Sequence, residues 1–240
     1  MTNMPLLETT ALSKHFGGVS ALRDVSVTLN QGETLGMIGP NGSGKTTFVN
    51  AVTGTLRADS GSIQFAGTRT LGFAPNQLAA IGLVRTYQAV RVFGGLSVEA
   101  NIRTAGLLPG EAGISRSEYD ELLTWLRLDG LPHKEAASLT LFEQRRLELM
   151  MRLVLRPKVI MLDEPVGGLA VTEVREMINL LAELKARCTI FVIEHTMRVI
   201  RELADRVVVL VSGEKIADGP PTEILRDSKV IEHYLGTAHA

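Results

Sequence analysis

Apolar and polar residues near the start of the chain alternate with the period of two that is typical of a half-buried β-strand. Val25, Val27 and Leu29 carry this pattern within a region, 6–35, that we interpret as β-structure. An apolar strand at 33–40 then runs into glycines, and a helix is predicted directly after it. The apolar residues of that helix recur at helical spacing and are Phe48, Val49, Val52 and Leu56. The pattern therefore predicts a strand, a glycine-rich turn and a helix in succession.

A longer helical region follows a short strand pair around 63–65. Between about 97 and 155, apolar residues recur three and four positions apart. Ser117, with Asp120 three residues later, predicts the start of one helix, which Gly130 is expected to end. Its apolar face is formed by Tyr119, Leu122, Leu123 and Leu126, and that of a second helix by Leu147, Met150, Met151 and Val154. We therefore expect a helical insertion in the middle of the chain.

Strands and helices alternate again after Pro157. Apolar strands are predicted at 158–163, 188–193 and 206–212, with an amphipathic helix at 173–187. This alternation predicts a mostly parallel sheet covered by helices on both faces, with no internal repeat or low-complexity linker. The fold class is therefore α/β, with a helical insertion.

Composition narrows the classes of function. The chain has 240 residues, 45% of them hydrophobic, and its 25 Lys+Arg against 26 Asp+Glu leave a net charge of −1. This balance argues against a nucleic-acid partner, which would need a basic surface. Charges interrupt every apolar run before the roughly 18–20 residues of a bilayer span, and the first ten residues lack the features of a secretory signal. A single cysteine, Cys188, excludes an internal disulfide, so we expect a cytosolic protein.

The strongest chemical motif lies between the strand at 33–40 and the helix that follows it. Residues 39–46 fit the pattern G-x-x-x-x-G-K-[ST] in full. Gly42 and Gly44 free the main-chain amides to point at phosphates, Lys45 supplies a cation, and the Thr46 hydroxyl can ligate Mg²⁺. The predicted nucleotide-binding residues are Gly39, Pro40, Asn41, Gly42, Ser43, Gly44, Lys45, Thr46 and Thr47. The alternative, an ordinary glycine-rich turn, does not account for the Lys-Thr pair.

Two acids end the apolar strand at 158–163. The carboxyl end of a parallel strand is where ligands bind in such sheets, so Asp163 is a candidate Mg²⁺ ligand acting through water. Glu164 is then a candidate general base for the attacking water. Solvated or capping acids are the alternative. Together, the two motifs predict binding of ATP with Mg²⁺, and its hydrolysis.

At this point the sequence resembles the ATP-binding subunits of ABC transporters over essentially its whole length. Within that family it is most similar to those of high-affinity branched-chain amino-acid importers, although the ATPases of lipid exporters share much of the pattern. The supporting segments are 84–93 (VRTYQAVRVF), 144–148 (QRRLE) and 233–236 (HYLG). The resemblance implies a P-loop NTPase core with an N-terminal antiparallel β subdomain and a helical insertion.

The resemblance also implies how the chain is divided and what three further residues do. It implies one ABC ATPase domain over 1–240, with a nucleotide-binding core at 1–88 and 157–240 and a helical signature subdomain at 89–156 that docks on transmembrane permease subunits. Phe16 is expected to stack on adenine, with a buried core aromatic as the alternative. Gln88 is expected to ligate Mg²⁺ and to relay nucleotide state, and His195 to hydrogen-bond the γ-phosphate; an exposed surface glutamine and a structural histidine are their alternatives.

The chain departs from the family signature L-S-G-G-Q. The aligned residues are Leu139, Thr140, Leu141, Phe142 and Glu143. We expect a helix beginning near Gln144, a benzyl group at 142 that impedes approach of a partner's phosphate, and repulsion from the carboxylate of Glu143. On that basis Phe142→Gly should raise turnover. Ala170 likewise replaces the usual Asp or Asn. The alternative is that both departures are harmless.

An intact phosphate site beside a degenerate signature predicts an asymmetric pair. We expect a heterodimer with a second ATP-binding subunit, on the cytoplasmic face of the membrane, that energises import of branched-chain or related amino acids or amides. A solute-binding protein would be an indirect partner. Two other interpretations remain: a regulatory module that binds ATP with little hydrolysis, and a soluble ABC-type protein without a transporter.

Overall fold

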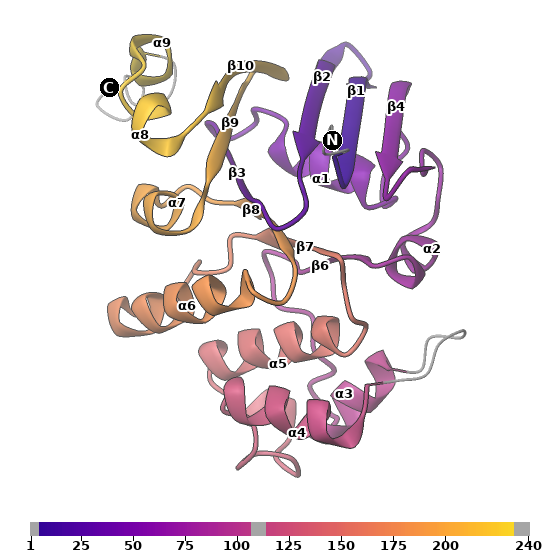
Figure 1. Ribbon diagram of the computed structural model, residues 1–240, viewed down its shortest axis with the longest axis vertical. Coiled ribbons are helices and arrows are strands. Elements are labelled where there is room, and N and C mark those ends of the chain that lie inside the picture. The colour runs from indigo at the N-terminus through magenta and orange to yellow at the C-terminus, as the bar shows by residue number, and fades with distance from the viewer. Residues whose placement is uncertain (1–4, 107–113, 233–240) are drawn as a thin grey trace.

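The computed structural model describes residues 5–106 and 114–232, which form two β-sheets and a set of helices (Figure 1). The first sheet is antiparallel, with strand order β2-β1-β4-β5. Its strands are β1 (Leu7–Phe16), β2 (Val19–Leu29), β4 (Ser60–Phe65) and β5 (Thr68–Arg69). Val25, Val27 and Leu29 are all buried, whereas the polar residues between them are not, so the predicted alternation is confirmed.

The second sheet is mostly parallel and has the strand order β10-β9-β3-β8-β7-β6. Only β10 runs antiparallel to its neighbour. The strands are β3 (Thr34–Ile38), β6 (Leu83–Arg85), β7 (Val159–Asp163), β8 (Thr189–Ile193), β9 (Arg206–Val211) and β10 (Glu214–Gly219). The predicted α/β class, with a mostly parallel sheet and an N-terminal antiparallel sheet, is confirmed.

Helices cover both faces of the parallel sheet because alternate residues of its strands are apolar on each side. In β7, Val159 and Met161 join the core shared with α1, whereas Ile160 and Leu162 join the core shared with α5 and α6. The helices are α1 (Lys45–Val52), α2 (Pro75–Ala80), α3 (Val98–Ala105), α4 (Arg116–Trp125), α5 (Leu141–Leu153), α6 (Val171–Leu184), α7 (Met197–Leu203), α8 (Pro221–Ile224) and α9 (Ser228–Val230), with a 3₁₀ turn at Ala136–Ser138.

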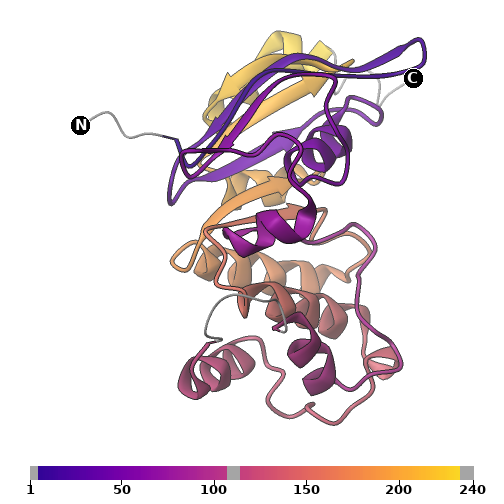
Figure 2. The same ribbon diagram turned by 90° about the vertical axis from the view of Figure 1, so that its right-hand side faces the viewer.

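Helices α3, α4 and α5 gather at the end of the molecule opposite the antiparallel sheet (Figures 1 and 2). This is the helical insertion that the sequence predicts between β6 and β7. Within the described ranges, no helix combines the length and apolar character that crossing a bilayer requires. The segment 233–236 used for the family resemblance lies outside the described residues.

The predicted helix boundaries are wrong by a few residues at several ends. The N-cap of α4 is Ser115, whose Oγ accepts a hydrogen bond from the Glu118 amide, so Ser117 lies inside the helix. The same helix ends at Trp125, before Gly130, because Arg127 adopts a left-handed φ of 51°. Helix α5 begins at Leu141 rather than near Gln144, and α6 spans 171–184 rather than 173–187.

Candidate functional site

Four neighbouring strands bring most of the predicted site residues to one edge of the parallel sheet. In the order β3-β8-β7-β6, these strands are all parallel, so their carboxyl ends lie together. The glycine-rich loop at 39–44 follows β3, and His195 follows β8. Asp163 ends β7, and Gln88 follows β6. The topology therefore assembles one site from segments that are far apart in sequence.

The conformation of the loop at 39–44 favours glycine at three positions with positive φ, and at two of them a Cβ would also collide with the main chain. Gly39 has a φ of 150°, and a Cβ there would lie 2.0 Å from the carbonyl oxygen of Leu210. Gly44 has a φ of 104°, and its Cβ would lie 2.4 Å from the carbonyl oxygen of Ala21. A Cβ on Gly42, by contrast, would meet nothing within 4 Å. The loop is thus pinned at both ends and open in its middle.

Lys45, the first residue of α1, is buried against this loop. Its Nζ donates hydrogen bonds to the carbonyl oxygens of Gly39 (2.7 Å) and Pro40 (3.0 Å). Burial lowers the pKa of Lys45, and the charges of Glu164 and Asp163 oppose that decrease. The cation therefore lies between the loop and the two acids, with neutral carbonyls as its only direct partners among the hydrogen bonds of the described residues.

These residues fit the phosphates of a nucleotide. The buried Oγ of Ser43 has no hydrogen-bond partner, and Gly42 faces open space beside it. Thr46 is exposed in the first turn of α1, so its hydroxyl is accessible to a metal ion. A buried cation, a free hydroxyl donor and the N-terminus of a helix are what an anionic group needs.

Asp163 is buried beside a cation that sequence reasoning did not assign to the site. Nη2 of Arg85 lies 3.2 Å from Oδ2 of Asp163, and the Asp163 amide donates to the Thr86 hydroxyl. Burial raises the pKa of Asp163, while Arg85 opposes the rise. The available signal for Arg85 was a charged residue ending an apolar strand.

Gln88, Glu164 and His195 lie close together. Nε2 of Gln88 donates a 2.7 Å hydrogen bond to Oε2 of Glu164, and Nδ1 of His195 lies 3.7 Å from Oε1. Glu164 has a left-handed φ of 49°, which directs its side chain away from the line of β7 at a cost of about 1–3 kcal/mol. The carboxylate and the imidazole remain partly accessible to solvent, which suits groups that act on a ligand.

Glu194 holds the segments on both sides of this cluster, and sequence reasoning missed it. Its side chain is fully buried and accepts hydrogen bonds from the amides of Val166, His195 and Thr196. Burial raises the pKa of Glu194, and these amides oppose the rise. The signal for it was an acid placed directly between an apolar strand and His195.

Phe16 lies apart from these residues, at the end of β1 in the antiparallel sheet. Its ring is 51% exposed, which excludes the alternative of a buried core aromatic. Nζ of Lys14 lies 5.6 Å from the centroid of the ring. An exposed ring with a nearby cation leaves one face free for stacking.

The signature residues form the N-terminus of α5, which is closed by its own side chains. Thr140 is the N-cap: its Oγ1 accepts from the Glu143 amide (3.2 Å), and Oε2 of Glu143 accepts from the Thr140 amide (2.8 Å). Leu139 is buried, and Leu141 is 39% exposed. This capping box satisfies two amides at the end of the helix and places a carboxylate there.

The expected obstruction by Phe142 is wrong. Its ring is only 7% exposed, because position 142 faces the core from the first turn of α5. The guanidinium of Arg146 lies 4.6 Å from the ring centroid, one turn further along. The benzyl group therefore packs inside the molecule and is not presented to a partner. The repulsion expected from the carboxylate of Glu143 stays a prediction.

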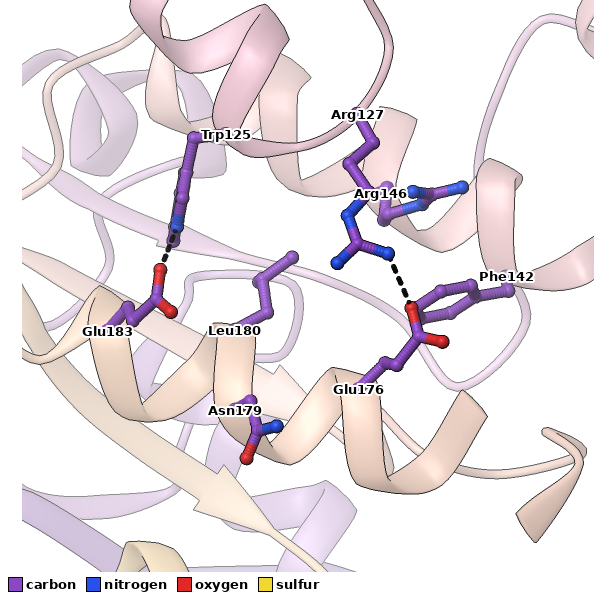
Figure 3. Close-up of a pocket in the computed structure, with 8 residues that line it drawn as sticks. All are labelled: Trp125, Arg127, Phe142, Arg146, Glu176, Asn179, Leu180 and Glu183. Carbon is purple, nitrogen blue, oxygen red and sulfur yellow. Dashed lines mark hydrogen bonds and ion pairs between the residues drawn. The ribbon is translucent and has the colours of Figure 1, made fainter. Parts of the chain in front are cut away.

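Phe142 and Arg146 line a pocket of about 230 Å³ between α6 and the α4–α5 region (Figure 3). Nε1 of Trp125 donates to Glu183 across this pocket, and Arg127 pairs with Glu176 (2.9 Å). Phe142 is the only predicted site residue among those that line it. The pocket is thus a junction between helices and does not belong to the phosphate site.

A glycine loop around a buried lysine, next to an acid-ended strand with Gln88 and His195, defines a P-loop ATPase. A family model described as "ABC transporter" matches residues 22–167, and one described as "Branched-chain amino acid ATP-binding cassette transporter" matches 214–240. The chain belongs to the ATP-hydrolysing subunits of ABC transporters, and the predicted family is confirmed.

Curated relatives and solved structures agree with this assignment. The high-affinity branched-chain amino acid transport ATP-binding protein LivG of Salmonella typhimurium is 37% identical over 98% of this chain and 100% of its own length. BraF of Pseudomonas aeruginosa, of the same description, is 34% identical over 98% and 99%. The ADP conformation of an ATP-binding cassette of an ABC transporter superposes with a TM-score of 0.88, at 31% identity, covering 97% of this chain and 99% of the other.

Proposed function

We propose that this chain hydrolyses ATP to energise import of branched-chain or related amino acids or amides. The observation that carries this proposal is the Gln88–Glu164–His195 cluster, which lies at the same edge of the parallel sheet as the loop that contacts Lys45. The names of the LivG and BraF relatives support the substrate class. The chain itself would never contact the solute.

Each site residue has a role that follows from its position. Lys45 exchanges its two carbonyl partners for phosphate oxygens, which is favourable because a charge-assisted bond replaces a neutral one. Thr46, Asp163 and Gln88 are the residues that would hold Mg²⁺, which offsets phosphate charge when bound. Phe16 would stack on adenine through its free face.

Glu164 is positioned to accept a proton from an attacking water. Gln88 holds one of its oxygens at 2.7 Å, and the other faces His195. His195 is exposed and can donate to the terminal phosphate. A general base needs an accessible oxygen and a fixed orientation, and both conditions hold here.

The segment 89–156 would dock on transmembrane permease subunits, with 1–88 and 157–240 as the nucleotide-binding core. Phe93 and Leu96 are 53% and 39% exposed on the loop before α3 and offer an apolar contact. The chain would then lie on the cytoplasmic face of the membrane as a peripheral subunit. A solute-binding protein would act on it only through the permease.

A second, different ATP-binding subunit is the partner that the signature favours. The carboxylate of Glu143, hydrogen-bonded at the N-terminus of α5, would face the terminal phosphate of a nucleotide bound by the partner. Self-pairing would repeat this repulsion in both sites. A heterodimer would confine it to one site and leave Lys45, Asp163 and Glu164 to work against an intact signature.

The same capping box supports one other function, a regulatory module that closes on ATP with little hydrolysis. The rate of ATP hydrolysis distinguishes the catalytic function from the regulatory one. Glu164→Gln should abolish ATP hydrolysis by the assembled transporter if this chain is catalytic, and it should leave the rate unchanged if the chain only regulates.

Light scattering on purified Glu164→Gln protein, with and without Mg·ATP, tests the pairing. The substitution should trap any closed dimer, and Lys45→Ala serves as the control that cannot hold phosphate. A mass that remains near 26 kDa while ATP binds supports the heterodimer, since the chain mass is 26.0 kDa. A shift to about twice that value contradicts it and means that Glu143 is accommodated in a homodimer.

A further inference from the structure

One face of helix α5 contacts the main chain of the segment 85–91, which carries Gln88 and which we call the Q segment. Arg145, Glu148 and Arg152 form this face, because residues three and four apart lie on one side of a helix. Nε of Arg152 donates to the carbonyl oxygen of Arg85 (2.8 Å), and Nη2 of Arg145 lies 3.5 Å from that of Gln88. The helix therefore contacts the Q segment at its start and at Gln88 itself.

Glu148, the middle residue of this face, is 1% exposed, and its buried Oε1 has no hydrogen-bond partner among the described residues. Burial raises the pKa of Glu148, whereas Arg152 and the amides of Tyr87 and Arg91 oppose the rise. Nη2 of Arg152 lies 3.7 Å from its Oε1. Glu148 is thus a buried carboxylate close to two arginines and to the amides of the Q segment. Stability alone does not explain it, because an apolar residue of similar size would fill the same space at no cost of burying a charge.

Arg145 also contacts the chain on the other side of the catalytic cluster. The same Nη2 donates a 2.6 Å hydrogen bond to the carbonyl oxygen of Gly167, three residues after Glu164. One guanidinium thus lies against the segment that carries Gln88 and the segment that carries Glu164. These are the two residues joined by the 2.7 Å hydrogen bond.

We propose that Arg145, Glu148 and Arg152, the α5 seam, are positioning residues that set the place of Gln88 relative to Glu164. The seam acts on the Q segment through the main-chain carbonyl oxygens of Arg85 and Gln88. The functional part of the proposal rests on the role proposed above for Gln88.

Arg146 is a matched control within the same helix. Like Arg145 it is buried (8% against 7% exposed), and the Nε of each lacks a hydrogen-bond partner. Its guanidinium, however, lies over the ring of Phe142 and lines the pocket between α5 and α6 (Figure 3). Replacing either arginine by methionine removes a buried guanidinium, and only one replacement removes contacts to the Q segment.

Hydrogen exchange of the full-length chain without nucleotide tests the mechanical part. Arg145→Met should speed exchange in peptides covering 86–92 by about tenfold or more, as expected for the loss of a hydrogen bond to a charged donor, and Arg146→Met should not. Arg145→Lys, which keeps the charge, should restore part of the protection and serves if the methionine variant does not fold. Unchanged exchange at 86–92 in Arg145→Met, or an equal increase in Arg146→Met, would contradict the proposed positioning role of the α5 seam.

Binding of a non-hydrolysable ATP analogue, with Mg²⁺ and with EDTA, tests the functional part. In the wild type, Mg²⁺ should increase the affinity for the analogue. Arg145→Met should reduce this increase by about tenfold, and Gln88→Ala should reduce it similarly. The affinity of Arg145→Met measured in EDTA should equal that of the wild type. An equal loss in EDTA would mean a general defect of the site and would overturn the positioning role. If Gln88→Ala keeps the full gain while exchange at 86–92 responds to Arg145→Met, the metal role of Gln88 is overturned and the mechanical seam stands.

Discussion

Phe142→Ala should destabilise the protein strongly, although the alignment with a glycine suggests the opposite. Phe142 is 7% exposed and belongs to the core cluster that contains the buried residues of α5 and α6. It also carries the guanidinium of Arg146 on its face at 4.6 Å. Truncation enlarges the pocket that Phe142 and Arg146 already line and removes the contacts of the ring with the surrounding core.

The magnitude follows from these contacts. Removing a buried phenyl ring costs about 3–5 kcal/mol, of which the cation–π contact supplies about 0.5–2 kcal/mol. A domain's whole stability is about 5–15 kcal/mol, so the loss is a large fraction of it. For a chain of this length the midpoint of thermal unfolding should fall by roughly 6–20 °C.

Urea unfolding followed by tryptophan fluorescence measures this loss directly. Trp125 is the single tryptophan and lines the same pocket as Phe142, so its emission reports on that region. Phe142→Leu is the control, with an expected loss below about 1.5 kcal/mol. A loss for alanine under about 1 kcal/mol, at an unchanged m value, would refute the packing described here.

Three further substitutions test other parts of the structure. Gly44→Ala should lower the free energy of unfolding by at least about 2 kcal/mol, because the new Cβ would lie 2.4 Å from the carbonyl oxygen of Ala21. The same substitution should weaken ATP binding. An unchanged midpoint of thermal unfolding would contradict the loop conformation. Burial raises the pKa of Glu148, so the stability that this group contributes is present below about pH 4.5 and is lost as pH rises through its folded-state pKa. The free energy of unfolding of Glu148→Gln relative to wild type should therefore increase from about pH 4.5 upward, and a flat difference would show that the group titrates normally. Arg127→Ala should cost less than about 1 kcal/mol, because its pair with Glu176 is exposed, and raising the salt concentration should shrink even that.

The sheet and the phosphate loop could be predicted because their signals are local. A period-two run identified a strand of the first sheet, short apolar runs identified the strands of the parallel sheet, and the glycine spacing before Lys45 identified the loop. The placement of Asp163 beside that loop required only the rule that ligands bind at the carboxyl ends of parallel strands. The placement of His195 came from the family resemblance. Each step depends on a few consecutive residues and on chain topology.

The interactions that hold the site together could not be predicted, because they join distant segments. Glu194 binds the Val166 amide across 28 residues, and Arg85 pairs with Asp163 across 78. The error over Phe142 had a different cause. The capping box of Thr140 and Glu143 starts the helix three residues earlier than expected, and that rotates position 142 into the core.

Asn101 gives the loop before α3 a property that matters for assembly. The side chain is fully buried, receives a hydrogen bond from the Phe93 amide, and donates to the carbonyl oxygens of Phe93, Leu96 and Ser97. The exposed ring of Phe93 and the methyl groups of Leu96 are therefore held in place before any partner arrives. A partner that covers Phe93 and Leu96 would lose little backbone entropy on contact, so a small apolar patch could support a specific and rapid attachment.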